Sequence, residues 1–523
     1  MEKFSFAFFS LATFVFIATV NRSEADSSVI DLGGEWNFAS SNKTITGTGT
    51  VPGDIYTDLF NNKIIDDPLY GDNHLFTTWI SNDDWSYSRR FNFDMQQLNK
   101  ASAFLITEGL DTIAAVSLNG KQIAQSSNQF VSSFADITKL LQDQNTIQVD
   151  FKSPVQYAAQ MASAYKTSSG HDVPPVCPPS IQHGDCHPNF LRKAQYSFSW
   201  DWGPSFPTIG ISQPIRIAVV ESVYFKDFTW TTQLDGNFWN VNVETLVLNQ
   251  NENSEVVWII SIDELGVEME FVRKIREGTQ MTTHQMQVKV LDSKVERWWP
   301  NGAGKQKLYD IKVAMLRGKE MTKKIGFKTV DLVQDYVDPN KVGLGRDFYF
   351  RINGVPIFLK GSNWIPISMF PLTGNYTDRL RFLLDSAAEV GMNALRVWGG
   401  GLYETEEFYN YASTKGILIW QDLMFACALY PTNKEFLDSV QTEMQQQIWR
   451  LRKHASILVY AGNNENEIAI RDHWWSVSNY SEAQEVSDYV ALYADTISPI
   501  VRQSDPSRPF LLSSPSNGIQ TEM

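Results

Sequence analysis

The sequence predicts a multidomain protein: a β-sandwich, a second and smaller β-sandwich, and then part of a parallel β/α barrel. Its 523 residues allow about three or four domains at roughly 150 residues each. Up to about residue 335, short runs that alternate apolar and polar residues are broken by Gly, Asn and Asp, as is typical of antiparallel strands. Beyond about residue 338, strand-like and helical runs alternate, which indicates βα units. We expect the three parts to cover residues 26–220, 221–335 and 336–523.

The first 25 residues have the pattern of a targeting segment. Lys3 precedes an apolar run from Phe4 to Val20, and small residues around Ala25 suit cleavage, so we expect a signal peptide over residues 1–25. The run is somewhat long for this purpose, which leaves an uncleaved signal anchor as an alternative. No later stretch is apolar enough to span a bilayer, so we expect no membrane attachment after cleavage.

Entry into the secretory pathway would have two consequences. The expected destinations are the lysosome or the outside of the cell, and the sequence does not decide between them. The Asn-x-Ser/Thr triplets at Asn42, Asn375 and Asn479 become candidate glycosylation sites.

Charge and composition exclude some partners. The formal charge of −15 argues against nucleic acid and anionic membrane surfaces, because both attract basic patches. Aromatic residues make up 13% of the chain, with 16 Trp. Flat aromatic rings suit sandwich cores and sugar faces alike, so composition alone does not separate these uses.

Two segments illustrate the predicted sandwiches. In Ser117–Ile123, the pair Asn119-Gly120 stands between apolar residues, which predicts a tight hairpin turn. Trp239–Glu244 alternates apolar and polar residues in the second sandwich. We expect no long helix before about residue 335.

The three cysteines fall into a pair and a single residue. Cys177 and Cys186 lie in one loop rich in Pro and Gly, and in an oxidising compartment they should form a disulfide. A metal site with His183 and His187 is the alternative, but the spacing matches no familiar zinc pattern, so we expect no metal. Cys427 ends an apolar run and is expected to be a buried free thiol.

The last part of the chain contains fewer strand-like runs than a barrel of eight strands requires. Its predicted helices cover Asp378–Glu389, Lys434–Lys453 and Glu482–Arg502. Its predicted strands are Ile357–Gly361, Asn393–Trp398, Ile417–Asp422, Leu458–Ala461 and Phe510–Ser514. The sequence therefore predicts about five strands and a barrel that is cut short.

One of these strands ends in a group of polar residues. The apolar run Leu458–Ala461 stops at Gly462-Asn463-Asn464-Glu465, so Asn464 and Glu465 should lie at the carboxyl end of a buried parallel strand. A carboxylic acid beside an amide there suits a general acid that protonates a leaving oxygen, as glycoside hydrolysis requires. The alternative is a solvated loop carboxylate.

Several segments together resemble the β-mannosidases of glycoside hydrolase family 2. They are Val51–Leu59, Asp67–Gly71, Arg192–Pro204 (RKAQYSFSWDWGP), Trp398–Glu404 (WGGGLYE) and Gly462–Glu467 (GNNENE). The resemblance runs from about Asp31 to the last residue. It implies a jelly-roll domain, an immunoglobulin-like domain and a catalytic (β/α)8 TIM barrel, in agreement with the pattern of strands and helices.

The resemblance also implies roles for individual residues. Glu465 matches the acid/base catalyst, and Asn464 matches the residue that bonds the sugar 2-hydroxyl. Trp200, Asp201 and Trp202 match a loop of the jelly-roll domain that reaches over the barrel and contacts mannose. From the residues alone, a core Trp pair around a capping Asp explains that loop equally well. The predicted disulfide would stiffen the approach to it.

Arg396 and Trp398 end the second predicted barrel strand and are candidates for the wall of a sugar subsite. A core Trp and an ion-paired Arg are the alternatives. Asp422 and Glu404 also lie at strand ends, but a structural ion pair with a nearby Arg explains each, so neither is placed in the predicted site.

The activity implied by the resemblance is removal of terminal β-D-mannose residues from oligosaccharides and glycoproteins by an exo-acting, retaining hydrolase without metal or cofactor. No residue matches the second carboxylate, which acts as nucleophile, so this chain by itself is expected to be inactive. Another family 2 exo-β-glycosidase and a non-catalytic sugar-binding product are the alternatives. The sequence does not determine the oligomeric state.

Overall fold

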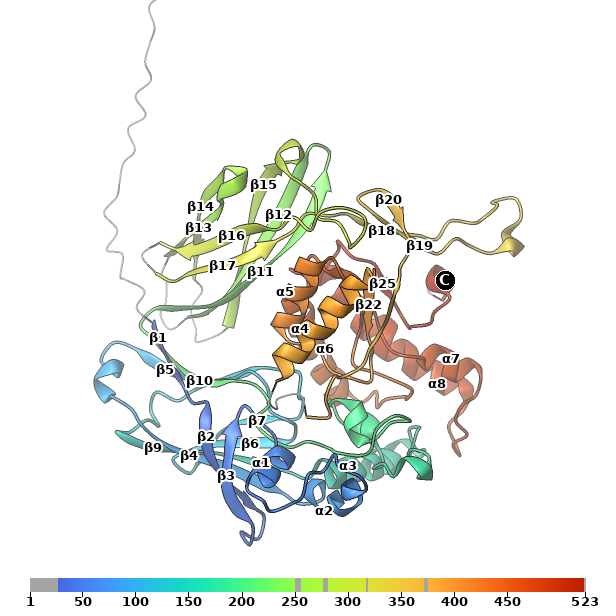
Figure 1. The fold of residues 1–523 in the computed structure, drawn as a ribbon. Helices are drawn as coiled ribbons and strands as arrows, with labels where there is room; N and C mark the ends of the chain where they lie inside the picture. The colour runs from blue at the N-terminus through green and yellow to red at the C-terminus, as the bar shows by residue number, and fades with distance from the viewer. Residues whose placement is uncertain (1–26, 250–254, 276–280, 317, 371–374, 522–523) are drawn as a thin grey trace, which may run out of the picture.

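The computed structural model describes residues 27–521 except 250–254, 276–280, 317 and 371–374 (Figure 1). The predicted signal peptide, residues 1–25, lies outside the described residues, so it stays a prediction. No helix in the described ranges combines the length and the apolar character needed to cross a membrane.

The first part of the chain is a β-sandwich, as predicted. One sheet has the order β3-β2-β4-β9-β6-β7 and the other β1-β10-β5-β8, and all their pairs are antiparallel. Apolar side chains of both sheets share one core, among them Trp36 of β2 and Ile217 of β10. The predicted hairpin turn at Asn119-Gly120 joins β6 to β7. The strands are β1 Ser27–Asp31, β2 Gly34–Ser40, β3 Thr46–Val51, β4 Trp85–Asn92, β5 Ser102–Thr107, β6 Ala114–Leu118, β7 Lys121–Ser126, β8 Ser133–Asp136, β9 Gln144–Phe151 and β10 Ile215–Val220.

This part also contains a long helix, α3 (Pro154–Ser169), so the expectation of no long helix before residue 335 is wrong. Its ends carry ordinary signals: the Ser153 side chain accepts a hydrogen bond from the Gln156 backbone N–H, and Gly170 ends the helix at a φ of 84°. Its buried face consists mainly of alanines, Ala158 and Ala162, so the helical period is weak in the sequence. The shorter helices are α1 Ile55–Asn61 and α2 Thr78–Ser81.

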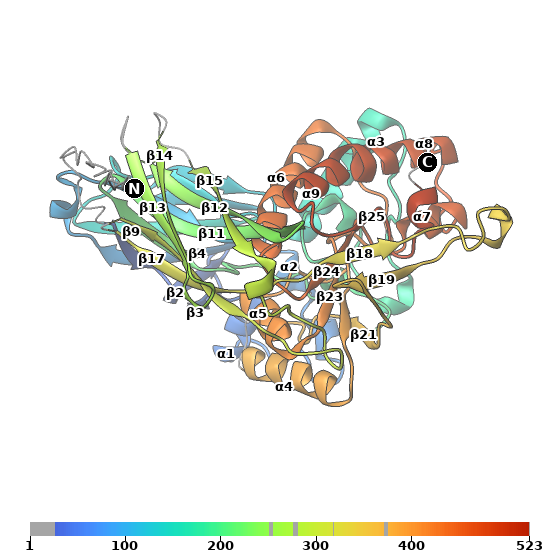
Figure 2. The ribbon, with the colours of Figure 1, turned by 90° about the horizontal axis from the view of Figure 1, so that it is seen from above.

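The second part is also a sandwich, as predicted. Its sheets have the orders β11-β12-β15 and β14-β13-β16-β17. Trp230, Trp239 and Trp258 lie in the core between them. The strands are β11 Val223–Asp235, β12 Phe238–Asn249, β13 Glu255–Ile262, β14 Val267–Lys274, β15 Met281–Leu291, β16 Tyr309–Met315 and β17 Glu320–Ile325. Figure 2 shows this sandwich beside the first one and at a distance from α7 and α8.

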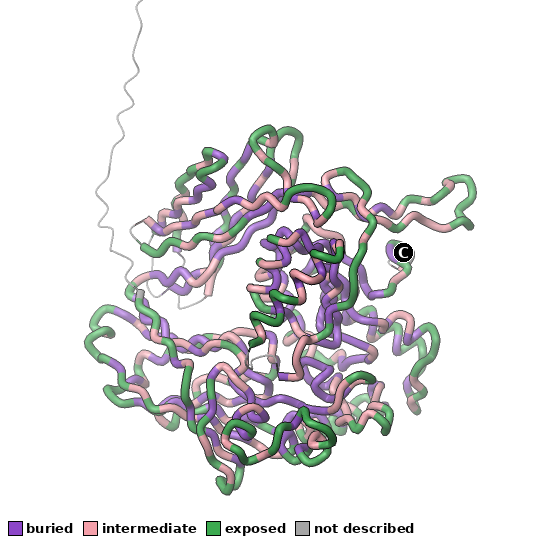
Figure 3. The backbone as a smooth tube through the Cα atoms, viewed as in Figure 1, coloured by how far each residue is buried: buried purple, intermediate pink, exposed green. Residues whose placement is uncertain are grey.

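The last part contains a five-stranded parallel sheet whose spatial order, β21 to β25, is the order along the chain. Helices lie between successive strands and cover the sheet, and the strands run through the most buried region of the molecule (Figure 3). The strands are β21 Gly361–Trp364, β22 Ala394–Val397, β23 Leu418–Asp422, β24 Ile457–Ala461 and β25 Phe510–Leu511, and the helices are α4 Tyr376–Glu389, α5 Glu406–Lys415, α6 Lys434–Leu451, α7 Asn466–Arg471, α8 Glu482–Tyr489 and α9 Ser498–Ser504.

Two predicted elements of this part differ in the structure. The strand predicted at Ile357–Gly361 is wrong: the chain there leaves a small antiparallel sheet, β18 Val330–Val333, β19 Tyr349–Ile352 and β20 Val355–Ile357, and the first parallel strand begins only at Gly361. Phe358, the second residue of the predicted strand, is 83% exposed. Gly361 is required where it stands, because a Cβ there would lie 1.9 Å from the carbonyl oxygen of Ala394.

The helix predicted at Glu482–Arg502 is interrupted. A π-helical segment, Val490–Ile497, separates α8 from α9. Pro499, in the first turn of α9, has no N–H for the α-helical ladder and crowds the carbonyl four residues earlier, so a regular α-helix cannot continue through it.

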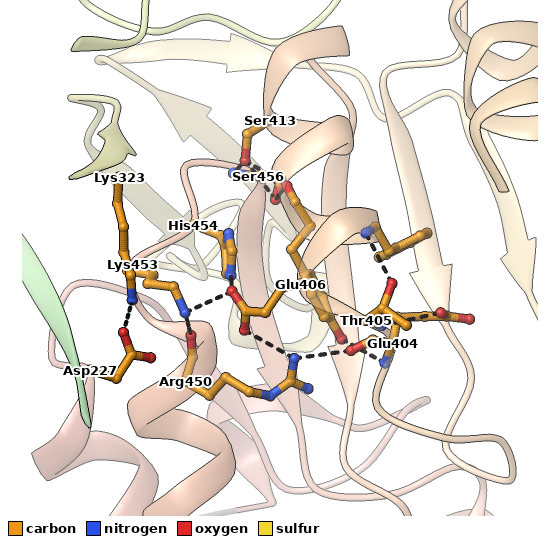
Figure 4. A network of polar contacts seen from close by, with 12 residues as sticks. Asp227, Lys323, Glu404, Thr405, Glu406, Ser413, Arg450, Lys453, His454 and Ser456 are labelled. Carbon is orange, nitrogen blue, oxygen red and sulfur yellow. Dashed lines mark hydrogen bonds and ion pairs between the residues drawn. The ribbon is translucent and has the colours of Figure 1, made fainter. Parts of the chain in front are cut away.

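A polar network, in which Lys453 and His454 are buried and Glu406 is exposed, supports α5 close to the second sandwich (Figure 4). Glu406, in the first turn of α5, lies 2.9 Å from Lys453 Nζ, 3.2 Å from His454 Nε2 and 3.2 Å from Arg450 Nη1. Burial and the neighbouring Lys453 lower the pKa of His454 to about 4, although Glu406 opposes the shift. His454 is therefore neutral in the folded protein over most of the acidic range.

This shift predicts a loss of stability in acid. An unfolded histidine titrates near pH 6.5, so between about pH 6.5 and 4 the unfolded chain binds a proton that the folded chain does not. Stability should fall by about 3 kcal/mol from this residue as the pH drops through that window. In His454→Gln that part of the loss should disappear, as measured by urea unfolding at pH 7 and pH 4.5. His74→Gln serves as control, and equal acid losses in wild type and His454→Gln would contradict the assignment.

Candidate active site

The candidate acid stands at the carboxyl end of β24, whose five residues are all buried. Gly462 passes close to the next strand, since a Cβ there would lie 2.4 Å from the Leu512 carbonyl oxygen. The buried Asn463 side chain donates to Leu512 O at 2.9 Å and accepts from the Asn466 N–H at 3.0 Å. The turn is therefore held on both sides, and Glu465, at a φ of 67°, is the residue directly before α7.

The Glu465 carboxylate is held through one oxygen. Its Oε2 accepts hydrogen bonds from Cys427 Sγ at 3.1 Å and from Asn464 Nδ2 at 3.0 Å. In the part of the chain that the structure describes, the recorded hydrogen-bond partners of this side chain are thus a thiol and an amide. It lines a cavity of about 620 Å³ together with Arg396, Asn464, Trp420 and Ser514.

Cys427 differs from the expected buried thiol, because it is partly exposed and contacts the candidate acid. The loop after β23 runs beside the loop after β24: the Cys427 N–H donates to Asn464 O at 3.0 Å, and the Asn464 N–H donates to Phe425 O at 2.9 Å. Parallel strands end at the same edge of a sheet, so the position of Cys427 just after the predicted strand Ile417–Asp422 was the signal that could have placed it here.

Burial raises the pKa of the Cys427 thiol, and the charge of Glu465 and, in smaller part, that of Asp201 raise it further. The thiol is therefore protonated and acts as a hydrogen-bond donor to Glu465.

Arg396 joins the candidate acid to a buried carboxylate. Its Nη2 donates to Asp422 Oδ2 at 2.6 Å and to Asn464 Oδ1 at 2.8 Å. Burial raises the pKa of Asp422, and the guanidinium opposes that shift. The structure thus contains the ion pair given as one alternative for Arg396, and it also places the guanidinium at the cavity beside Glu465.

The ion pair expected for Glu404 is wrong. Its buried carboxylate accepts from Trp364 Nε1 at 2.9 Å and from the Tyr376 hydroxyl at 2.9 Å, while Arg450 donates to its backbone oxygen. Burial raises the pKa of this carboxyl group. The two donors are neutral side chains on β21 and α4. Both lie far from Glu404 along the sequence, so the sequence did not reveal them.

The loop Trp200–Trp202 of the first sandwich meets the end of β22. The Trp200 ring lies edge-on to Trp398 at 4.6 Å between ring centroids, and the Trp202 ring lies 5.9 Å from Trp398. Asp201 and Trp202 are exposed. The rings form an aromatic cluster between two parts of the chain, and only glycine fits at Gly400, where a Cβ would lie 2.1 Å from the Trp398 ring.

A buried ion pair, which the sequence did not reveal, anchors this loop. Arg192 donates from Nε and Nη2 to the two oxygens of Glu443 on α6, at 2.8 and 2.7 Å. Gln195 donates to the Ala426 carbonyl oxygen at 2.7 Å, one residue before Cys427. The segment before the Trp200 loop is therefore fixed to α6 and to the loop that carries Cys427.

The predicted disulfide between Cys177 and Cys186 is present. Its loop lies against the Trp200 segment, since the Asp185 N–H donates to Phe198 O at 3.0 Å and Ser205 Oγ donates to Asp185 Oδ2 at 2.5 Å. Among the described residues, no group of three or more His, Cys, Asp or Glu side chains is placed to hold a metal ion. Asn42, Asn375 and Asn479 are all exposed, and their glycosylation stays a prediction.

Comparison with known proteins agrees with this geometry. The profile described as "Glycosyl hydrolase 2 galactose-binding domain-like" matches residues 36–213, and "Glycosyl hydrolases family 2" matches residues 223–328. A probable beta-mannosidase of Caenorhabditis elegans is 50% identical over 502 residues, which are 95% of this chain and 55% of that protein. The beta-mannosidase of Capra hircus is 42% identical over 504 residues, or 94% of this chain and 56% of that protein. The chain thus spans about half the length of these relatives.

Among solved structures, the beta-D-mannosidase from Dictyoglomus thermophilum has a TM-score of 0.82 and 31% identity, covering 93% of this chain and 58% of that one. An exo-chitosanase from Amycolatopsis orientalis, at 16% identity and a TM-score of 0.67, shares the fold. The two family matches follow one another along more than half of the chain, and the similarity to beta-mannosidases extends through β24 and Glu465. The chain therefore belongs to glycosyl hydrolase family 2 and is a homologue of its beta-mannosidases.

Proposed function

We propose that this chain carries the acid/base half of an exo-acting, retaining β-mannosidase site, with Glu465 as general acid and then general base. The observation that carries the proposal is the position of Glu465 at the carboxyl end of β24, facing a cavity, with Oε2 held by Cys427 and Asn464. Both recorded bonds go to one oxygen, so Oε1 is the atom proposed to give its proton to the glycosidic oxygen. After the sugar is transferred, the same carboxylate would take a proton from water.

Asn464 and Arg396 are proposed to position the sugar. The Asn464 amide donates to Glu465 and accepts from Arg396, so its orientation is determined by its two neighbours. The second N–H of its amide group makes a weak contact with Cys427 Sγ at 3.3 Å. A sugar 2-hydroxyl would replace that contact with a stronger one, which gains most as the oxocarbenium-like transition state forms.

Trp200, Asp201, Trp202 and Trp398 are proposed to form the wall of the sugar site. Indole faces suit the apolar face of a pyranose ring, and the exposed Asp201 carboxylate can accept from hydroxyl groups. The names of the relatives support mannose as this sugar. Terminal β-D-mannose residues of oligosaccharides and glycoproteins are the proposed substrates, and no metal or cofactor is required.

The architecture proposed for the whole site is a barrel. The strands β21 to β25 are parallel and neighbour one another in chain order, which is how consecutive strands of a (β/α)8 barrel are arranged. We propose the ranges 26–220 for a jelly-roll domain, 221–335 for an immunoglobulin-like domain and 336–523 for barrel sequence. A retaining mechanism needs a second carboxylate about 5 Å from the first. That nucleophile is not assigned to any residue of this chain, so the proposal is restricted to the acid/base half.

The contact between Cys427 and Glu465 can be tested by alkylation. Cys427 is the free cysteine, so iodoacetamide reports on this thiol alone. Glu465→Gln removes the negative charge that raises the thiol pKa, and alkylation at pH 8 should become about tenfold faster for each pKa unit recovered. Glu467→Gln, two residues along the chain, is the matched control. Equal rates in the wild type and Glu465→Gln would show that the two groups do not interact.

A hydrolysis assay tests the proposal that this chain carries only the acid/base half of the site. The 523-residue chain should release no aryl alcohol from an aryl β-D-mannoside above the rate in buffer, because no glycosyl-enzyme can form without the second carboxylate. Glu465→Gln should give the same result, and circular dichroism should show both proteins folded. Turnover by the wild type that is lost in Glu465→Gln would place both carboxylates within these residues and refute the restriction.

Binding tests the sugar site without turnover. Methyl β-D-mannoside should bind to the chain, and Asn464→Ala should weaken it by about 1–3 kcal/mol, since hydrogen bonds to the sugar and the orientation of Glu465 are lost together. Titration calorimetry measures both affinities. Asn42→Ala, on the exposed surface of the first sandwich, should bind as the wild type does. An unchanged affinity in Asn464→Ala would remove this residue from the proposed site.

A further inference from the structure

A second cavity lies beside the Trp200 loop. It has a volume of about 590 Å³ and is distinct from the cavity lined by Glu465. Three segments far apart in the sequence line it, residues 68–74, 181–183 and 200–204. We call it the loop pocket. Its volume lies within the range of pockets that bind small ligands.

The loop pocket is held in place by several contacts. Asp67 accepts from the Leu69 N–H at 3.0 Å, and the Asn73 side chain donates to Asp67 O at 2.7 Å, so the 67–73 segment is closed on itself. The Cys177–Cys186 disulfide closes the loop that carries residues 181–183. Gly184 permits that loop to pack against the Trp200 segment, because a Cβ there would lie 2.6 Å from Phe198 O. The pocket is therefore preorganised.

Its lining combines exposed apolar groups with polar ones. Leu69 is 54% exposed, Ile181 is 85% exposed and Trp202 is 39% exposed. Exposed apolar side chains that converge from separate loops are typical of a binding surface, whereas single scattered ones are not. Gln182 and Asp201 add hydrogen-bonding groups to the same lining. A flat indole beside amide and carboxylate groups suits a pyranose ring, which has one apolar face and hydroxyl groups at its edge.

Two residues that line the pocket connect it to the surroundings of the candidate acid. Asp201 lines it, and the charge of Asp201 acts on the Cys427 thiol that contacts Glu465. Trp202, also part of the lining, contacts Trp398 at the end of β22. A general acid must reach the glycosidic oxygen, so the leaving group lies on the acid's side of the bond.

We propose that the loop pocket binds the sugar residue on the reducing side of the scissile bond, with its ring against Trp202 and between Leu69 and Ile181. This inference rests on the proposed function, since it requires a terminal mannose at Glu465. The disulfide loop would then determine which linkages and leaving sugars are accepted, because it forms one wall of the pocket.

The test compares methyl β-D-mannoside with β-1,4-mannobiose by titration calorimetry, with Glu465→Gln in every protein so that neither ligand is hydrolysed. Mannobiose should bind at least tenfold more tightly. Ile181→Arg and Leu69→Arg, which fill the pocket from two different lining segments, should each bring the two affinities within about twofold of one another and leave the affinity for methyl β-D-mannoside unaffected. Val272→Arg, on the distant strand β14, should retain the tenfold difference.

The outcomes separate the two proposals. If methyl β-D-mannoside binds but mannobiose binds no better, or if its advantage survives in both pocket variants, the loop pocket is not the leaving-sugar site and the proposed function stands. If neither sugar binds to folded protein, the proposed function fails and this inference fails with it.

Discussion

The buried ion pair between Arg192 and Glu443 is the contact on which the candidate site depends. Two charges removed from water are costly unless geometry and further hydrogen bonds satisfy them. Here the guanidinium meets the carboxylate with two nitrogens, and Tyr403 and Asn128 donate to the same carboxylate. The Arg192 guanidinium also lies 3.8 Å from the centroid of the Phe425 ring. These contacts attach two segments of the first part of the chain, at Asn128 and Arg192, to α6.

From this pair, contacts lead to the candidate acid in a few steps. Gln195, three residues after Arg192, holds the carbonyl oxygen of Ala426, and it accepts from the Tyr430 hydroxyl at 2.7 Å. The next residue, Cys427, donates to Glu465. The same segment continues into Trp200 and Trp202, which contact Trp398 at the end of β22 and line the loop pocket. One set of contacts therefore connects the candidate acid, the aromatic cluster of Trp200, Trp202 and Trp398, and the loop pocket.

Sequence patterns predicted well wherever the structure follows local rules. Alternation predicted both sandwiches, Asn119-Gly120 predicted a hairpin, and the shared loop of Cys177 and Cys186 predicted a disulfide. They failed where a local pattern is weak or is overruled. The buried face of α3 consists mainly of alanines, so its helical period is weak in the sequence. The apolar run around Phe358 resembles a buried strand, but the strand that pairs with β22 begins after it, at Gly361. Pro499 is visible in the sequence, but it interrupts the α-helix only because the helical chain continues past it into α9.

The sequence by itself determined the kind of chemistry: a carboxylate and an amide after a buried strand, a Trp-Asp-Trp loop, and a family resemblance that names a sugar. It did so because strand ends, turns and short motifs are encoded by neighbouring residues. Only the tertiary structure decided which groups contact Glu465, that Arg396 serves both Asp422 and Asn464, and that Glu404 is held by an indole and a phenol. Those partners lie tens to hundreds of residues apart, and their contacts follow from how the sheets and loops pack rather than from any spacing along the chain.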